Sequence, residues 1–112
     1  STYDLVSLLE DARRDVDNRI RKKMFQKYLK NNQIKNKENY LNEYKVLAIN
    51  RHLKVIGIFT RLFVRDNKKN YLKHIPRLWK LIEKNSNFIF LNQINEWLNE
   101  YFPKRKRTIP TK

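Results

Sequence analysis

Apolar residues recur along the chain with the spacing of amphipathic helices. In the first stretch they stand at Leu5, Leu8, Leu9, Ala12 and Val16, which share one face of a helix. Ser1 and Asp4 have the spacing of a capping box, and the helix dipole favours an anion at Asp4. We predict a helix from the start of the chain to about residue 14, and its apolar face needs a partner surface.

Four further helices are predicted from the same periodicity, at about residues 19–30, 37–65, 71–83 and 88–102. Residues 16–18 supply a break and a new N-cap before the second helix. The third carries the longest apolar stripe, so we expect it to be the central strut. Pro76 falls inside the fourth, where it kinks the helix or marks its true first turn. Because strand signals are few, the predicted fold class is all-α with about five helices.

The domain organisation is predicted to be simple. A chain of 112 residues is long enough for one domain with a modest core. We assign residues 1–102 to a helical subdomain and expect residues 103–112, which begin with Pro103, to form a basic, disordered tail. In the last helix, the side chains predicted to face inward are Phe90, Leu91, Ile94, Trp97 and Leu98.

The chain is strongly basic, with 26 Lys and Arg residues against 11 Asp and Glu residues and a net charge of +15. Such a charge is compatible with nucleic-acid binding. The basic residues are spread over all the predicted helices, however, and no helix interleaves basic and aromatic residues on one face. A generally basic surface is therefore favoured, and a small basic helical nucleic-acid-binding module is the alternative function.

Other classes of protein are disfavoured by composition. The chain has no cysteine, so disulfides and thiolate metal sites are excluded. Its longest apolar run, residues 55–59, is much shorter than the ~20 residues that a membrane span needs, and no signal peptide is visible. We expect a soluble, cytoplasmic protein. The single glycine, Gly57, cannot form a phosphate-binding loop, and we expect it to let another helix approach closely.

Catalytic chemistry has few candidates. His52 and His74 lie on different predicted helices and lack the spacing of a helix-borne zinc site, so each is interpreted as a packed or exposed bystander. The acidic residues of the first stretch could hold Mg²⁺, but interleaved arginines favour a salt-bridged surface instead. The acids are Glu10, Asp11, Asp15 and Asp17, and the arginines are Arg13 and Arg14.

Arg51 departs from the apolar pattern of the central helix, since it falls between Ala48 and Val55. A buried arginine needs a carboxylate or a bound anion, because an unpaired buried charge is very costly. Two interpretations stay open: Arg51 pairs with Asp4 or Asp11, or it faces a polar cleft.

Two stretches resemble a known enzyme family. They are residues 3–16, YDLVSLLEDARRDV, and residues 50–62, NRHLKVIGIFTRL, with continuing matches through Arg65, Asp66, Tyr71, Leu72, Pro76 and Arg77. They resemble aminoglycoside phosphotransferase-like kinases, and most closely the bacterial anomeric kinases of N-acetylmuramate and N-acetylglucosamine. The first stretch resembles the segment that follows the metal-binding aspartate motif. The resemblance covers about residues 3–83.

The resemblance implies phosphoryl transfer from ATP, with Mg²⁺, to a sugar hydroxyl in cell-wall sugar recycling. This chain would be the helical C-terminal part of the large lobe of a two-lobe, kinase-like fold. The family's nucleotide-binding lobe, catalytic loop and metal-binding aspartate would lie before residue 1. We therefore expect a fragment that needs the missing N-terminal lobe as its partner and is not catalytic alone.

The resemblance also suggests roles for individual residues. Asp4 matches the family's helix-start aspartate, which looks like a buried brace beneath the catalytic loop. Asp11, Arg13 and Arg51 are candidates for the wall of the acceptor-sugar pocket, chosen for their polarity on otherwise apolar faces. An exposed apolar patch near Leu5, Leu8 and Phe59, where the missing lobe would dock, is a further expectation.

Overall fold

The computed structural model describes the backbone of residues 2–86 and 92–111 and the side chains of residues 4–86 and 96–111. All regular structure in these ranges is helical, which confirms the predicted all-α class. The elements are α1 (Thr2–Leu9), α2 (Asn18–Asn31), α3 (Lys37–Asp66), the 3-10 turn η1 (Leu72–His74), α4 (Ile75–Ser86), α5 (Asn92–Tyr101) and the 3-10 turn η3 (Lys104–Lys106). No helix in the described ranges combines the length and apolar character needed to cross a membrane.

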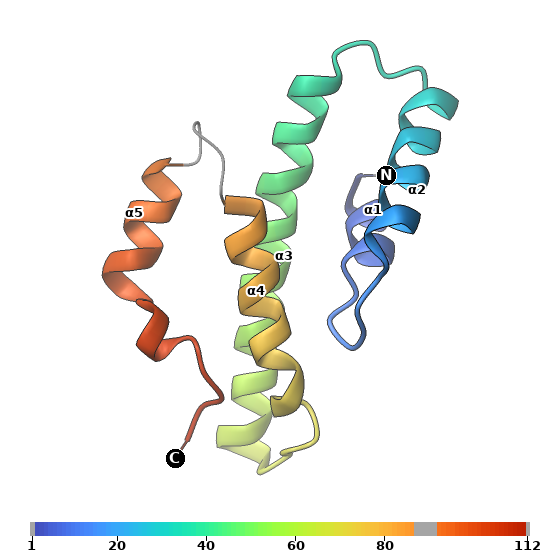
Figure 1. Ribbon diagram of the computed structural model, residues 1–112. Coiled ribbons are helices and arrows are strands. Elements are labelled where there is room, and N and C mark those ends of the chain that lie inside the picture. Colours follow the sequence, from blue (N-terminus) through green and yellow to red (C-terminus); the bar gives the residue numbers. More distant parts are fainter. Residues whose placement is uncertain (1, 87–91, 112) are drawn as a thin grey trace.

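The long helix α3 is the central strut, as predicted. It runs the height of the molecule, with α1 and α2 on one side and α4 and α5 on the other (Figure 1). The Asn36 side chain caps its N-terminus by accepting the Asn39 N–H at 3.0 Å. Asn67 ends it in the left-handed conformation, with φ of 55°, and donates its N–H to the Phe63 carbonyl at 3.0 Å.

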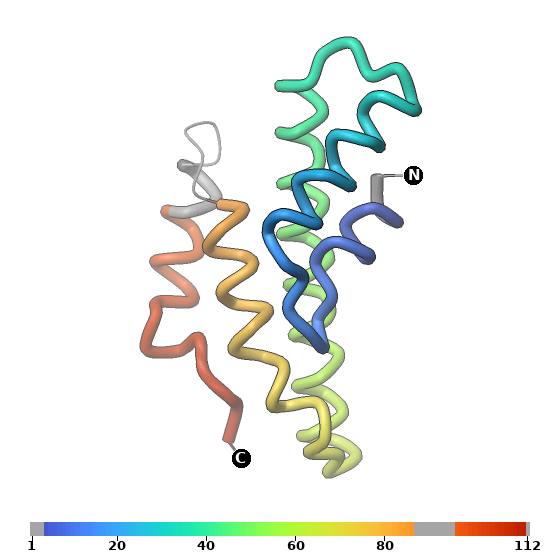
Figure 2. Tube along the Cα trace, turned by 45° about the vertical axis from the view of Figure 1, so that its right-hand side comes forward, coloured from blue at the N-terminus to red at the C-terminus, as the bar shows by residue number. Residues whose placement is uncertain are grey.

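Two clusters of buried apolar side chains lie along α3 and hold the other helices against it. The first joins α1 and α2 to the N-terminal half of α3 through Leu5, Val6, Leu9, Leu29, Tyr40, Tyr44 and Ala48. The second joins η1, α4 and α5 to the rest of α3 through Ile49, Phe63, Leu72, Ile75, Trp79, Ile82 and Leu98. The 45° turn of Figure 2 shows α1 and α2 crossing in front of α3 while α4 runs beside it.

The first helix is shorter than predicted, because α1 ends at Leu9 rather than near Arg14. The Asp11 carboxylate accepts the backbone N–H of Arg13 at 2.8 Å, and this local bond replaces the next turn of helix. Residues 10–17 therefore form a connector. The prediction of an N-cap before the second helix is confirmed, since Asp17 accepts the Arg19 N–H at 2.8 Å.

The start of the fourth helix, α4, is compatible with its proline. Pro76 is the second residue of α4, in the first turn, where the missing N–H of proline would have had no helical partner. Pro76 thus marks the true first turn, which was one of the two predicted outcomes. The preceding residues Leu72–His74 form the separate 3-10 turn η1.

The last helix, α5, agrees with the prediction in part. Leu98 is buried, as predicted, but Trp97 is 49% exposed, so its predicted inward orientation is wrong. The periodic spacing of apolar residues shows which face of a helix they share, but it does not show how much of that face the neighbouring helix covers. The side chains of Phe90, Leu91 and Ile94, and the predicted start at residue 88, lie outside the described residues.

The segment after Pro103 differs from the predicted disordered tail. Its first residues form η3, and Arg107 is bound to α4 and to the end of α5. The Arg107 guanidinium donates to Glu83 at 2.9 Å, to Asn99 at 3.1 Å and to the Phe102 carbonyl at 2.5 Å. Only 7% of the Arg107 side chain is exposed, so part of the basic segment packs on the helical body.

Of two further expectations, the one about Gly57 in α3 is wrong and the one about an exposed apolar patch holds only for Leu8. A Cβ placed on Gly57 would meet no atom within 4 Å among the described residues, so no described helix approaches closely there. Of the three residues expected in an exposed apolar patch, Leu8 is 52% exposed, but Leu5 is buried and Phe59 is partly buried against the second cluster. Leu5 instead packs in the first cluster with α2 and α3.

Candidate functional site

A buried carboxylate, Glu10, lies where α1, α3 and α4 meet. Its side chain is fully buried and receives hydrogen bonds from side chains distant in the sequence. Tyr44 donates its hydroxyl to Glu10 Oε2 at 2.5 Å, His52 Nε2 lies 3.0 Å from Oε1, and Asn85 Nδ2 donates to Oε1 at 2.6 Å. We call these four residues the Glu10 cluster. It joins the end of α1 to α3 and α4 through polar contacts inside the core.

The charge of Glu10 is favoured despite its burial. Burial alone would raise the pKa of its carboxyl, but hydrogen bonds from His52, Tyr44 and Asn85, together with the charge of His52, outweigh burial and lower the pKa. The same contact acts in the opposite direction on Tyr44, because burial and the adjacent Glu10 charge raise the pKa of its hydroxyl. The cluster therefore holds an ionised glutamate and a neutral tyrosine.

His52 completes the cluster with its Nε2 as the donor. An ionised carboxylate only accepts hydrogen bonds, so His52 Nε2 must carry the proton that faces Glu10. The other ring nitrogen, Nδ1, is buried and has no hydrogen-bond partner among the described residues. Arg21 adds a further positive charge at the edge of the cluster, with its Nη2 3.8 Å from Glu10 Oε2.

The Glu10 cluster is not among the predicted sites, although the sequence carries one signal for it. Tyr44, Ala48 and His52 follow one another at four-residue spacing and so share the buried face of α3. Of the two outcomes predicted for His52, a packed or an exposed side chain, the structure shows the packed one, with 1% exposure and a contact to Glu10. The interpretation of Glu10 as part of a salt-bridged surface is wrong, since its carboxylate is in the core.

A pocket of about 350 Å³ opens beside the cluster, between the connector after α1 and the helices α2 and α4. Its polar lining comes mainly from the residues that follow Glu10. The side chains and backbone lining it are those of Leu9, Glu10, Asp11, Arg14, Asp15, Val16, Asp17, Asn18, Arg21, Arg77 and Leu81. We call it the connector pocket. Its mixed charges and polar groups are suited to a hydrogen-bonding ligand.

Arg77 of α4 holds the connector in place at the rim of this pocket. Its Nε donates to Asp15 at 2.8 Å and its Nη1 to the Ala12 carbonyl at 3.4 Å. Arg77 thus contacts the connector at two points, the Asp15 side chain and the Ala12 backbone carbonyl. Asp15 itself is 87% exposed, so the ion pair contributes less than a buried one.

The predicted site residues Asp11 and Arg13 are brought together on the connector. Asp11 lines the connector pocket, and its carboxylate lies 3.8 Å from Arg13 Nε and 3.7 Å from Arg14 Nε. The side chain of Arg13 is 75% exposed and points away from the core. The predicted salt-bridged surface is therefore confirmed for Asp11 and for Asp15, whereas Asp17 caps α2.

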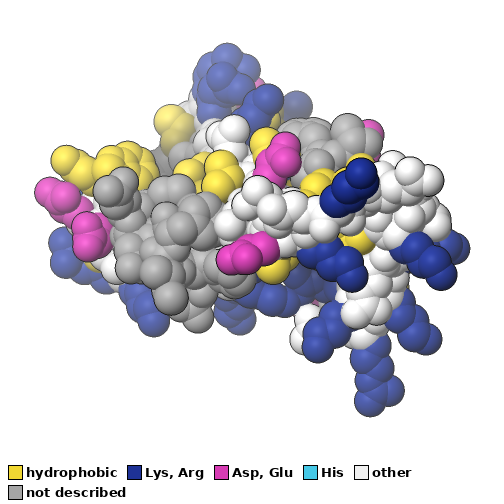
Figure 3. All heavy atoms as spheres, turned by 90° about the horizontal axis from the view of Figure 1, so that it is seen from above, with side chains coloured by type: hydrophobic (Ala, Val, Ile, Leu, Met, Phe, Trp, Pro, Cys, Tyr) yellow, Lys and Arg dark blue, Asp and Glu magenta, His cyan; other side chains and the backbone are white. Residues whose placement is uncertain are grey.

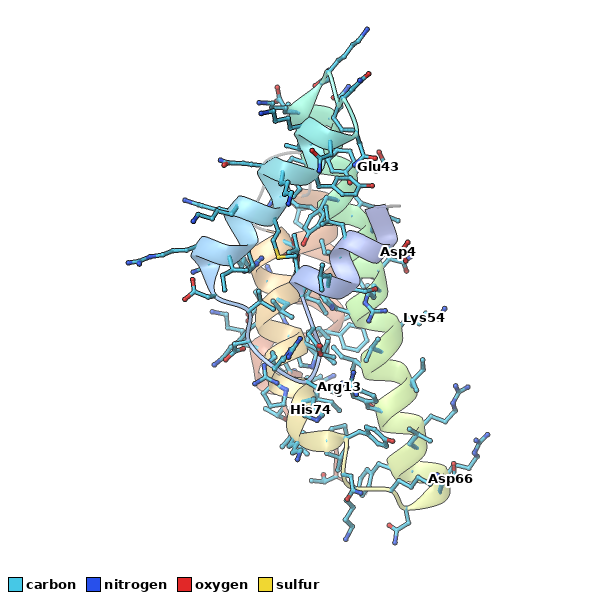
Figure 4. The ribbon with its side chains drawn as sticks, turned by 90° about the vertical axis from the view of Figure 1, so that its right-hand side faces the viewer. Asp4, Arg13, Glu43, Lys54, Asp66 and His74 are labelled. Carbon is cyan, nitrogen blue, oxygen red and sulfur yellow. The ribbon has the colours of Figure 1, made fainter. Side chains whose placement is uncertain are left out.

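Asp4 and Arg51 lie elsewhere. Asp4 is exposed in the first turn of α1, whereas Arg13 lies at the opposite end of that segment, nearer to His74 (Figure 4). Arg51 is half-buried on α3, next to His52. The apolar stripe of α3 includes His52 at the four-residue spacing, so the residue that enters the core there is His52. The pairing of Arg51 with Asp4 or Asp11 stays a prediction.

Metal ligation has no obvious centre in the part of the chain that the structure describes. No three His, Asp or Glu side chains come together there in a way that would hold an ion. The four acids of the first stretch have other partners. Glu10 lies in the buried cluster, Asp11 and Asp15 pair with arginines, and Asp17 caps a helix.

The basic residues are distributed over the surface. In the view from above, Lys and Arg side chains project from several sides of the molecule, with acidic and apolar side chains between them (Figure 3). This distribution agrees with the prediction of a generally basic surface. A local exception is the groove between α2 and α4, which several Lys and Arg side chains line.

Comparison with known proteins shows that the chain is similar to bacterial amino-sugar kinases. The N-acetylmuramate/N-acetylglucosamine kinase of Caulobacter vibrioides is 31% identical to it over 105 residues, which is 94% of this chain and 29% of the relative. The protein of the same name from Neisseria meningitidis serogroup B is 31% identical over 89 residues, 74% of this chain and 27% of the relative. The one from Pseudomonas aeruginosa is 44% identical over 46 residues, 41% of this chain.

These matches confirm the predicted resemblance to kinases of N-acetylmuramate and N-acetylglucosamine. The chain spans less than a third of the length of the curated relatives it matches. No family model matches the chain. No solved structure matches it significantly.

Proposed function

We propose that this chain is the helical C-terminal part of an ATP-dependent sugar phosphotransferase of the aminoglycoside phosphotransferase-like family. Its acceptor would be an amino sugar of the cell wall, N-acetylmuramate or N-acetylglucosamine, and its setting the recycling of these sugars in the cytoplasm. The observation that carries the proposal is the similarity over 94% of the chain to a kinase named for these two sugars.

In this proposal the chain supports catalysis and does not perform it alone. Phosphoryl transfer depends on positioning the phosphates and neutralising their charge, usually with bound metal ions. The four acids of residues 10–17 are engaged in ion pairs, a cap and a buried cluster, and in this proposal ATP and Mg²⁺ would be held by the rest of the parent protein. The missing N-terminal lobe is therefore the principal partner.

The role proposed for α1 is that of a brace. Asp4 lies exposed near the start of α1, where it is accessible to a loop of the missing lobe. The other end of α1 is fixed by the Glu10 cluster, and Leu5 and Leu9 pack against α2 and α3. A helix fixed in this way can hold Asp4 at a constant position, which a brace beneath a catalytic loop requires.

The role proposed for the connector is to form part of the acceptor wall. Asp11 lines the connector pocket, and Arg13 lies beside it on the same turn. Sugar hydroxyls are recognised by such carboxylate and guanidinium groups at a concave site. Arg51 is the third candidate for the wall and would contribute from α3. Its half-buried position allows it to contact a ligand on one side while packing on the other.

The experiment that tests the proposal is an activity assay on the longer reading frame that contains this chain. ATP consumption is measured with N-acetylmuramate, with N-acetylglucosamine and without sugar. Asp4→Ala should abolish sugar-dependent turnover, whereas Asp66→Ala, at the exposed end of α3, serves as the matched control. Asp11→Asn and Arg51→Gln should raise KM for the sugar more than they lower kcat. Equal loss in the Asp66 control would contradict the assignment of Asp4.

A further inference from the structure

A basic groove runs between α2 and α4 and continues toward α3. It consists of two adjoining pockets, of about 420 and 340 Å³, which share Arg21 and Lys84. The cationic side chains that line the two pockets are Arg21, Lys22, Lys45, Lys73, Arg77, Lys80 and Lys84. Among the lining residues the one carboxylate is Asp15, which is already paired with Arg77 at 2.8 Å.

The cations of this groove are close enough to affect one another. Burial and then the charge of Arg21 lower the pKa of Lys84. Burial also lowers the pKa of Lys45, and the charges of Lys84 and Arg21 add to the effect against the opposing attraction of Glu10. Lys84 donates to a neutral group, Asn18 Oδ1, at 3.3 Å. Crowded cations of this kind are relieved by an anion that bridges them.

The two pockets also have apolar walls. Leu9, Phe25 and Leu41 line the larger one, and Pro76 and Leu81 line the smaller. A ligand suited to the cationic lining and to the apolar walls carries a small group with more than one negative charge, joined to a less polar organic part. The volumes match those of small-molecule sites rather than of an extended polymer surface.

We propose that this groove binds the phosphate group of a small organic phosphate, with Arg21 and Lys84 as its central contacts. The Arg21 side chain is 18% exposed, and its guanidinium is oriented by Asn18, which accepts from Nη1 at 3.2 Å, and by Glu10, whose Oε2 lies 3.8 Å from Nη2. A planar guanidinium held in this way recognises phosphate oxygens, and Lys84 adds a point charge from the facing helix.

Single-stranded nucleic acid fits the groove less well. Its recognition relies on exposed aromatic rings on which bases stack. The aromatic residues that line the groove are Phe25, which is partly buried, and Tyr44, whose hydroxyl is bound to Glu10. The inference concerns this chain's own residues and does not depend on its being part of a kinase.

Calorimetric titration of the chain with inorganic pyrophosphate and with phenyl phosphate, at constant ionic strength, tests the proposal. We expect one binding site per chain. Lys84→Gln should weaken the affinity for both phosphates by about tenfold, because it removes one charge-assisted contact. The matched control is Lys54→Gln, which removes an exposed lysine of α3 that lines neither pocket, and it should change the affinity by less than about twofold.

Three results would overturn the proposal. The first is equal weakening by the two lysine variants, which would show general electrostatic attraction. The second is the absence of saturable binding by either phosphate. The third is tighter binding of a short single-stranded RNA than of either phosphate, with a steep dependence on salt, which would make the groove a nucleic-acid surface.

Discussion

Glu10 and His52 are 42 positions apart in the sequence, and their side chains meet inside the protein with Glu10 Oε1 3.0 Å from His52 Nε2. The contact joins the end of α1 to the middle of α3. Buried polar groups are costly unless they are hydrogen-bonded, and here each carboxylate oxygen has at least one donor. The packing of α1 against α3 therefore depends on a polar contact as well as on the apolar cluster around Leu5 and Leu9.

Removing the carboxylate should destabilise the fold. Glu10→Ala leaves the buried donors of Tyr44 and His52 without an acceptor and removes one of the two acceptors of the Asn85 amide, so we expect a loss of about 3 kcal/mol in the free energy of unfolding. Chemical denaturation followed by circular dichroism measures the loss. Glu100→Ala, at an exposed position of α5, is the control and should cost less than about 0.5 kcal/mol. Similar costs for the two variants would contradict the assignment.

The Glu10 cluster should also make stability depend on pH. Folding lowers the pKa of Glu10 below its ordinary value of 4.5, so its contribution is present above that pH and is lost as the pH falls through the folded pKa. Unfolding measured from pH 6 to pH 2 should show a decrease that is smaller in Glu10→Gln. An unchanged slope in that variant would assign the acid sensitivity to other carboxyls.

The hydroxyl of Tyr44 is expected to matter for the same reason. Tyr44→Phe removes one donor to Glu10 and leaves the ring packing intact, so a loss of about 1–2 kcal/mol is expected. Because folding raises the Tyr44 pKa, its stabilising contribution should also fade as the pH rises above the ordinary tyrosine value of 10.0. Tyr71→Phe, at an exposed tyrosine, is the control and should change neither quantity measurably.

Gly57 offers a test of the exposed face of α3. Its Cβ position is open among the described residues, so Gly57→Ala should stabilise the chain by about 0.5–1 kcal/mol through helix propensity alone. Thermal unfolding of the chain measures this gain. The same substitution in the longer parent protein reports on its surroundings there, because a loss of stability would show that another segment packs against this face.

Arg107 is predicted to fasten the segment after Pro103 to the helical body. Arg107→Ala removes its bonds to Glu83, Asn99 and the Phe102 carbonyl, so faster amide hydrogen exchange is expected at the end of α5. Arg105→Ala provides a control at an exposed neighbour of the same charge. Equal exchange in the two variants would show that Arg107 does not fasten the segment.

Much of the architecture could be predicted because it depends on local signals. The periodic stripe of α3, the Asp17 cap of α2 and the position of Pro76 are each readable within a few residues. The end of α1 could not be predicted in this way. The hydrogen bond from the Arg13 N–H to the Asp11 carboxylate that replaces the next helical turn spans only two residues and leaves the apolar periodicity unchanged.

The polar core could not be predicted in the same way. Its members come from α1, α3 and α4, and sequence periodicity places each on a face of its own helix without saying which faces meet. Periodicity singles out Arg51 as the polar residue within the apolar stripe, whereas the structure buries His52 and leaves Arg51 half-buried. Arg51 and His52 are neighbours, so a shift of one position along α3 decides which of them is buried. The four-residue spacing from Tyr44 through Ala48 agrees with the burial of His52.

The central claim is that this chain is part of a sugar kinase. The most direct measurement is ADP release by the protein encoded by the longer reading frame, with and without N-acetylmuramate or N-acetylglucosamine. The account predicts sugar-dependent ADP release by that protein and none by the 112-residue chain alone. Absence of sugar-dependent release from a folded longer protein that binds ATP would contradict it.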